Sequence, residues 1–222
     1  MKKGFTLVEI FLAISIFSIL AVSIYGVFHM GITAWRKMEA ILERSQELRL
    51  LMERMGIELR NCLDLDIEEH FIEQEKAYAF RGASNKMIFY TLKNGKIRSI
   101  IYKVEKNLEK TEELERDVFL LERAEKPFSP LVFGEDDFQG EVVLDLIKEL
   151  NFSYLERKSD TEEEWLDKWG ENDLQKKNLP AQVKIKIVFY VPTYLPVSRK
   201  IDYQEINIEK YVDLVTAKRK LQ

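Results

Sequence analysis

The residue most able to do chemistry in this chain is an acid that lies inside an apolar run. Residues 5–30 read FTLVEIFLAISIFSILAVSIYGVFHM, and Glu9 is the only charged residue among them. A carboxylate in hydrocarbon costs a few kcal/mol unless it is paired or lies near the interface. A nearby ammonium group would neutralise it in a dry environment. We therefore expect the carboxylate of Glu9 either to pair with a cation or to lie at the level of the lipid headgroups.

The rest of the chain offers little material for catalysis. His70 is the only histidine after residue 30, which is too little for a His-based catalytic site or a zinc site. The sequence has no G-x-S-x-G, P-loop or dinucleotide motif. Acidic clusters at 135–137 and 160–164 could hold calcium, but they lack the ligand spacing of calcium loops and are interpreted as solvated charge runs. We expect no enzyme activity, no metal and no cofactor.

Cys62 is the only cysteine, so an internal disulfide is excluded. We interpret it as a small buried residue of a helix rather than as a reactive thiol.

The distribution of charge argues against nucleic acid as a partner. The 222 residues carry a formal net charge of -4, and the first 30 contribute only Lys2, Lys3 and Glu9. The remainder is therefore at about −5. Nucleic-acid binding requires a basic face, which this acidic body does not predict.

The length of the apolar run around Glu9 fits a membrane-spanning helix. At about 1.5 Å per residue the run forms a helix about 39 Å long, against a hydrocarbon core of about 30 Å. Lys2 and Lys3 precede it, so the positive-inside bias predicts a cytoplasmic N-terminus and an exported body.

Three kinds of N-terminal segment have such a run. A cleaved secretory signal peptide would need a shorter apolar core followed by a small-residue cleavage site, whereas this run ends in Val27-Phe28-His29-Met30. A plain signal anchor explains the length but not the acid at position 9. The third kind is indicated by the string Gly4-Phe5-Thr6-Leu7-Val8-Glu9, which resembles the type IV prepilin motif.

That resemblance implies processing and assembly. A prepilin peptidase would cut between Gly4 and Phe5, and the new amine of Phe5 would be N-methylated. In pilin-like families the carboxylate at the position of Glu9 pairs with the N-terminal ammonium of another subunit and sets the axial stagger. The alternative remains a Glu9 that lies at headgroup level.

After Met30 the composition becomes amphipathic, which predicts that the helix continues to about Leu63. One apolar stripe consists of Ile41, Leu48, Met52, Met55, Leu59 and Cys62. A solvated face lies between them, made of Arg44, Glu47, Arg49, Glu53, Arg54, Glu58 and Arg60. Such a helix suits docking on a globular domain. A free coiled coil is the alternative, although the stripe allows only about three or four heptads.

Beyond residue 64 the pattern changes to short runs rich in aromatic and β-branched residues. These runs cover 77–80, 86–92, 97–104, 118–122, 141–146, 150–155, 181–191 and 198–206. Asn94-Gly95 predicts a hairpin turn between the second and third runs. Residues 208–221 fit either a short helix or an ordered tail. The fold class is therefore α+β, a long N-terminal helix packed against an antiparallel β-sheet, as in pilin-like proteins.

Two later stretches resemble the minor pseudopilin J family of the type II secretion system, also called general secretion pathway protein J. The first is Phe80-Arg81-Gly82 before Met87-Ile88-Phe89-Tyr90 and Ile101-Tyr102-Lys103-Val104. The second is Leu150–Leu155, then Trp165 and Trp169, then Leu179-Pro180 entering a long strand. We expect core or local packing of the two tryptophans, at helical spacing, rather than direct contact with a partner. Residues 106–117 and 169–179 depart from the family pattern.

The resemblance implies a non-catalytic subunit at the tip of a periplasmic filament, the pseudopilus. There it would join the I- and K-type minor pseudopilins, start filament assembly and support export of folded proteins. The chain would be a single-pass inner-membrane protein with a periplasmic C-terminal domain. Its expected parts are a leader at 1–4, a transmembrane and assembly helix at 5–30, an amphipathic continuation at 31–63 and a β-rich globular domain at 64–222.

Two other functions remain open at this point. A minor pilin of a type IV pilus or of a DNA-uptake pseudopilus would share the N-terminal motif and differ only in the later stretches. A membrane-anchored enzyme or binding protein would need a pocket with convergent polar groups, and the sequence shows no candidate residues for one.

Overall fold

The computed structural model describes residues 6–65, 80–128, 140–158, 162–170, 175, 178–195, 200–214 and 218–219. The chain divides into two compact units. One consists of Met1–Ser45 with Pro192–Gln204, and the other of Gln46–Val191 with Glu205–Gln222.

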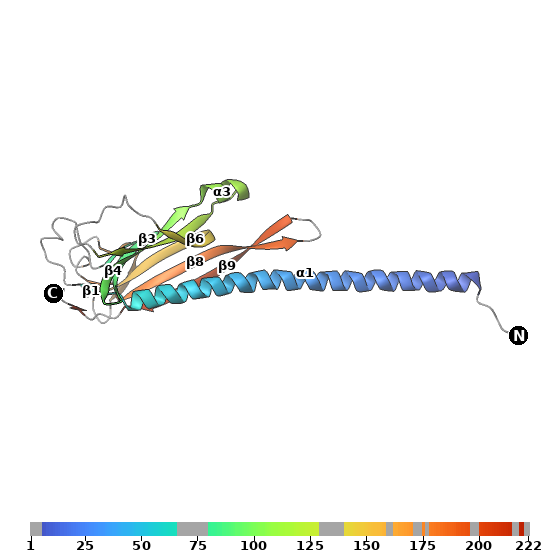
Figure 1. The fold of residues 1–222 in the computed structure, drawn as a ribbon, viewed down its shortest axis with the longest axis horizontal. Helices are drawn as coiled ribbons and strands as arrows, with labels where there is room; N and C mark the ends of the chain where they lie inside the picture. Colours follow the sequence, from blue (N-terminus) through green and yellow to red (C-terminus); the bar gives the residue numbers. More distant parts are fainter. Residues whose placement is uncertain are drawn as a thin grey trace. The chain divides into compact units, whose positions relative to one another are not determined.

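Helix α1 runs without interruption from Leu7 to Arg60 (Figure 1). Its residues lack proline, and the apolar run continues directly into the amphipathic stripe, so no breaking signal interrupts the backbone hydrogen bonds. The expected single helix is therefore present. Cys62 lies beyond its end and not inside it, because its backbone forms an isolated bridge with Thr91.

The second unit contains most of an antiparallel sheet of eight strands (Figure 1). The strands are β2 (Phe80–Ala83), β3 (Lys86–Lys93), β4 (Lys96–Lys106), β5 (Phe119–Pro127), β6 (Glu141–Arg157), β7 (Glu163–Leu166), β8 (Gln182–Leu195) and β9 (Lys200–Asp213). Their order is β2-β3-β4-β5-β6-β8-β9, and β7 pairs with β6. The expected α+β class, with a long helix and an antiparallel sheet, is confirmed.

The predicted hairpin joins β3 to β4. Asn94 and Gly95 have φ values of 53° and 72°, and Lys93 pairs with Lys96 on either side of them. Two consecutive positive φ values are what a two-residue type I′ turn requires, and Asn-Gly provides them at low cost.

Strand β6 joins two runs that the sequence separates. It passes through Leu146, which has a φ of 54°, and its pairing with both β5 and β8 shifts register in this region. A bulge of this kind bends a strand without ending it. The two predicted runs, 141–146 and 150–155, are therefore one strand.

Two further elements differ from expectation. Helix α3 (Leu108–Leu114) lies within the stretch that departs from the family pattern, and the Asn107 side chain caps it by accepting from Lys110 N at 3.0 Å. At the C-terminus, β9 continues to Asp213, and β10 (Lys218–Arg219) pairs in parallel with β1 (Asp64–Leu65). The described part of 208–221 is therefore strand except at Leu214, and the predicted run 77–80 is described only at Phe80.

The core of the second unit lies between the last turns of α1 and the sheet. Leu48, Met52, Met55 and Leu59 are buried in the helix. The largest fully buried side chains of the sheet are Phe80, Phe89, Tyr90, Tyr102, Phe152, Tyr154 and Phe189. Lys210 of β9 donates to the Met52 carbonyl at 2.9 Å. The predicted stripe from Leu48 to Leu59 is therefore the face that packs on the sheet, whereas Ile41 is only half-buried and Cys62 lies beyond the helix.

Candidate functional site

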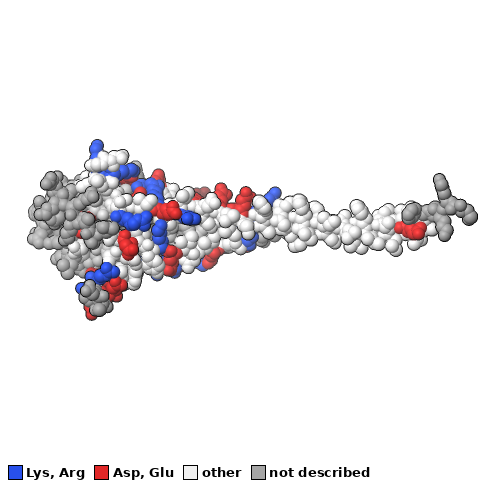
Figure 2. All heavy atoms as spheres, turned by 90° about the horizontal axis from the view of Figure 1, so that it is seen from below, with Lys and Arg blue, Asp and Glu red and all other residues white. Residues whose placement is uncertain are grey.

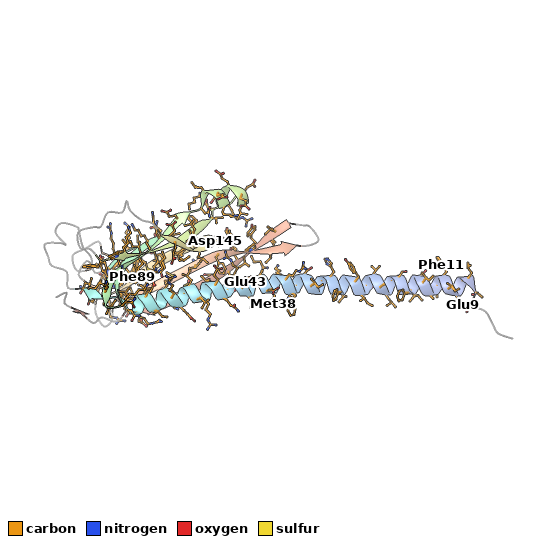
Figure 3. The ribbon with its side chains drawn as sticks, viewed as in Figure 1. Glu9, Phe11, Met38, Glu43, Phe89 and Asp145 are labelled. Atoms are coloured by element: carbon orange, nitrogen blue, oxygen red, sulfur yellow. The ribbon has the colours of Figure 1, made fainter. Side chains whose placement is uncertain are left out.

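The N-terminal end of α1, where Glu9 lies (Figure 3), is closed by a reciprocal cap between Thr6 and Glu9. Thr6 N and Thr6 Oγ1 each donate to Glu9 Oε2 at 2.9 Å, and Glu9 N donates to Thr6 Oγ1 at 3.3 Å. This is a capping box, which satisfies free backbone N–H groups at a helix start. Both residues are exposed. The Oε1 atom of Glu9 accepts no hydrogen bond from any described residue and remains available to a cation outside this chain.

The helix that follows Glu9 presents an apolar surface. α1 contains a window near the N-terminus that is long and apolar enough to cross a membrane, and none of that window is buried. Figure 2 shows uncharged surface along this part of the helix, with acidic atoms only near its N-terminal end. A fully apolar, exposed helix of this length is stable only if lipid or other apolar helices surround it.

The serine hydroxyls inside this window form hydrogen bonds with the backbone of their own helix. Ser15, Ser18 and Ser23 each donate to the carbonyl four residues earlier at 2.8 Å. Such bonding removes the cost of a hydroxyl in an apolar environment. Glu9 is thus the only ionisable side chain between Leu7 and Trp35 apart from Tyr25 and His29.

The other residues predicted for this site lie outside the described part of the chain. They are Lys2, Lys3, Gly4 and Phe5. The expected cut between Gly4 and Phe5, the N-methylation of Phe5 and the role of the two lysines in topology therefore remain predictions, as does the pairing of Glu9 with a neighbouring ammonium.

A second polar centre, which the sequence does not reveal, lies at the other end of α1. Arg123 Nη2 donates to Glu58 Oε1 at 2.7 Å, and Tyr102 OH donates to Glu58 Oε2 at 2.6 Å. The side chains of Arg123 and Glu58 are only 5% and 16% exposed. Burial and the neighbouring carboxylate raise the pKa of Tyr102, which keeps its hydroxyl a donor. Glu58, expected on the solvated face, instead joins the helix to β4 and β5.

The two tryptophans do not pack together at helical spacing. Trp165 lies on β7 and is 43% exposed, with its ring 5.9 Å from that of Tyr211. Trp169 is buried, and its backbone exchanges hydrogen bonds with Gly82 at the sheet edge. Trp169 thus lies in the core and Trp165 packs locally against Tyr211, as expected, but not at helical spacing, because residues 163–166 form a strand, in which side chains four positions apart do not meet as they do on a helix.

The described residues contain no group of three or more His, Cys, Asp or Glu side chains that could hold a metal ion. The cluster at 135–137, residues 160–161 and His70 lie outside that part of the chain. Cys62 is buried, and burial raises the pKa of its thiol, so it is not a reactive nucleophile.

The chain matches two family models, which meet inside α1. Residues 1–25 match the prokaryotic N-terminal methylation motif. Residues 26–191 match the type II secretion system protein J family. The second match covers most of the chain and includes every strand from β2 to β7, so it favours type II secretion over the type IV pilus alternative.

Proposed function

The chain belongs to the type II secretion system protein J family, and on that premise we propose that it is a non-catalytic minor pseudopilin of the pseudopilus tip. In this role it joins the I- and K-type minor pseudopilins, and the complex starts assembly of the filament that exports folded proteins. The observation that carries the proposal is the continuity of α1 across the two matched regions, from Leu7 to Arg60. One continuous helix contains residues of both matched regions.

The proposal assigns each part of the chain a task. Residues 1–4 are a leader removed by prepilin peptidase, with Lys2 and Lys3 holding it on the cytoplasmic side. Residues 5–30 anchor the precursor in the inner membrane and later form the assembly helix. Residues 31–63 contain the continuation of the helix, which ends at Arg60, and residues 64–222 form the periplasmic domain.

Glu9 is the residue to which we assign subunit docking. The Oε2 atom is engaged by Thr6 in the cap, and Oε1 points to no described donor. The N-methylated ammonium of Phe5 on an incoming subunit is a cation of suitable size and charge for that oxygen. In an apolar environment an unpaired carboxylate is costly, so a subunit in the wrong axial position would be disfavoured.

Co-purification tests the tip assignment. The full-length chain carrying a C-terminal tag is expressed with the I- and K-type subunits and extracted from the inner membrane. We expect all three subunits in one complex and loss of secretion when this chain is deleted. Recovery of the tagged chain without either partner, together with unimpaired secretion in the deletion strain, would contradict the proposal.

A further inference from the structure

A basic pocket lies at the turn between β3 and β4. It has a volume of about 370 Å³ and is lined by Lys93, Asn94, Lys96, Arg98 and Glu125. Three of these five residues are cations and one is an acid. The pocket therefore carries excess positive charge on a chain whose net charge is -4.

The acid in the pocket is already engaged. Lys93 Nζ lies 2.7 Å from Glu125 Oε2, and Arg123 Nη2 lies 3.2 Å from the same oxygen. In contrast, the side chains of Lys96 and Arg98 form no hydrogen bond or ion pair with any residue that the structure describes. Lys96 and Arg98 therefore lie near a carboxylate, Glu125, that already has two cationic partners. Their own charges remain available to an external anion.

The register of the hairpin makes this arrangement costly. Lys93 and Lys96 are directly opposite each other across the two strands, and like charges in that position destabilise a sheet. A turn needs only the positive φ values of Asn94 and Gly95, so nothing in the local fold requires lysine on both sides. Features that break a local rule without a structural benefit are typical of functional surfaces.

The pocket is also held in a fixed geometry. Arg98 pairs with Thr91 across the hairpin, and Thr91 in turn bridges to Cys62 just after the end of α1. On its other side Arg98 pairs with Pro127 of β5. The cations are therefore carried by strands with partners on both sides, and little ordering is needed when a ligand binds.

We propose that this pocket docks an acidic segment of a neighbouring subunit, with a carboxylate on Arg98 and another on Lys96. The guanidinium fork suits bidentate contact with a carboxylate, and the lysine adds a second point of charge. The inference rests on the proposed function, because it names the chemistry of one contact within the tip complex.

Site-specific photocrosslinking in membranes tests the pocket. A photoreactive amino acid replaces Asn94 in the full-length chain, which is expressed with the I- and K-type subunits. We expect an adduct whose partner peptide contains two or more Asp or Glu residues. In the variant K96E/R98E the adduct yield should fall about tenfold, as expected for the loss of close charge pairs.

The matched control is K106E, which makes the same kind of charge reversal on the same strand. Lys106 lies at the other end of β4 and pairs with Asp117 at 2.6 Å, where both side chains are well exposed. Because an exposed pair contributes little, the yield should stay within about twofold of the wild type.

The outcomes separate this inference from the function on which it rests. If the three subunits co-purify but Asn94 yields no adduct with an acidic peptide, the pocket proposal fails and the tip assignment stands. An adduct with anionic lipid, with a second copy of this chain or with residues 135–137 of the same chain would also overturn it. If the wild-type subunits form no complex, both proposals fail.

Discussion

Arg123 and Glu58 form the most buried ion pair among the described residues, and it joins the last turn of α1 to the middle of the sheet. Arg123 Nη2 lies 2.7 Å from Glu58 Oε1, and the arginine side chain is 5% exposed. Glu58 also accepts from Tyr102 of β4. The pair orients the helix on the sheet because its two ends come from elements 65 residues apart in the chain.

Replacing Arg123 by Met should destabilise the protein by about 3 kcal/mol, since it leaves the carboxylate of Glu58 buried without its main partner. Adding Glu58→Gln should recover part of this loss, because the charge that needs a partner is removed as well. Thermal unfolding of the full-length chain in detergent, followed by fluorescence of the buried Trp169, measures both effects. Additive losses in the double variant would show that the two side chains are not coupled.

Glu9→Gln should abolish assembly while keeping the helix cap. Glutamine can still accept from Thr6, because capping boxes use Glu or Gln at this position, but it cannot pair as an anion. Thr6→Ala is the matched control, since it removes the cap at a cost of about 1 kcal/mol and keeps the charge. Recovery of the I- and K-type partners from membranes is the measurement. Equal recovery with Glu9→Gln and wild type would rule out docking by charge.

If prepilin peptidase removes the leader, the mature chain should begin at Phe5. Intact-mass analysis of the chain purified from a strain with prepilin peptidase should show the loss of residues 1–4 and the gain of one methyl group on Phe5. In a strain that lacks the peptidase, the chain should retain Met1 or begin at Lys2. A mature chain that begins after Met30 would instead identify the segment as a secretory signal peptide.

Gly82→Ala should destabilise the domain by about 2 kcal/mol or more, as overpacking of a rigid core does. A Cβ atom there would lie 2.1 Å from Cζ of Tyr154, whose ring is fully buried and whose hydroxyl donates to the Ala83 carbonyl. Gly31→Ala is the control, because the added Cβ has no atom within 4 Å apart from its chain neighbours and the backbone of its own helix, and alanine favours the helix. Unfolding midpoints of the two variants should therefore shift in opposite directions.

The ion pairs of Glu125 should make the folded protein less stable in acid. The hydrogen bond from Lys93, with a further contribution from Arg123, holds the pKa of this carboxyl below its ordinary value of 4.5 despite partial burial. Because the folded-state pKa is depressed, its contribution is present above the unfolded-state pKa and is lost as pH falls through the folded-state value. The difference in unfolding midpoint between wild type and Glu125→Gln should shrink from about pH 6 to about pH 3. A difference that stays constant over this range would mean that Glu125 does not stabilise the fold through its charge.

The sequence by itself determined those features that depend on neighbouring residues in the chain. The helix from Leu7 to Arg60 follows from an unbroken apolar and amphipathic period without proline. The β3–β4 turn follows from the tolerance of Asn94 and Gly95 for positive φ. The N-terminal motif is equally local, and the family to which the chain belongs was already indicated by its motifs.

Only the tertiary structure decided which distant residues meet. Glu58 has the spacing of a solvated position on the helix, and its partner Arg123 is fixed by the order of the strands and not by any local signal. The bulge at Leu146, which makes β6 one strand, depends on pairing with β5 and β8. The basic pocket likewise depends on the strand order, which brings Glu125 of β5 beside the β3–β4 hairpin. Local patterns set backbone conformation, whereas the pairing of charges across strands depends on topology, which one-dimensional periodicity does not encode.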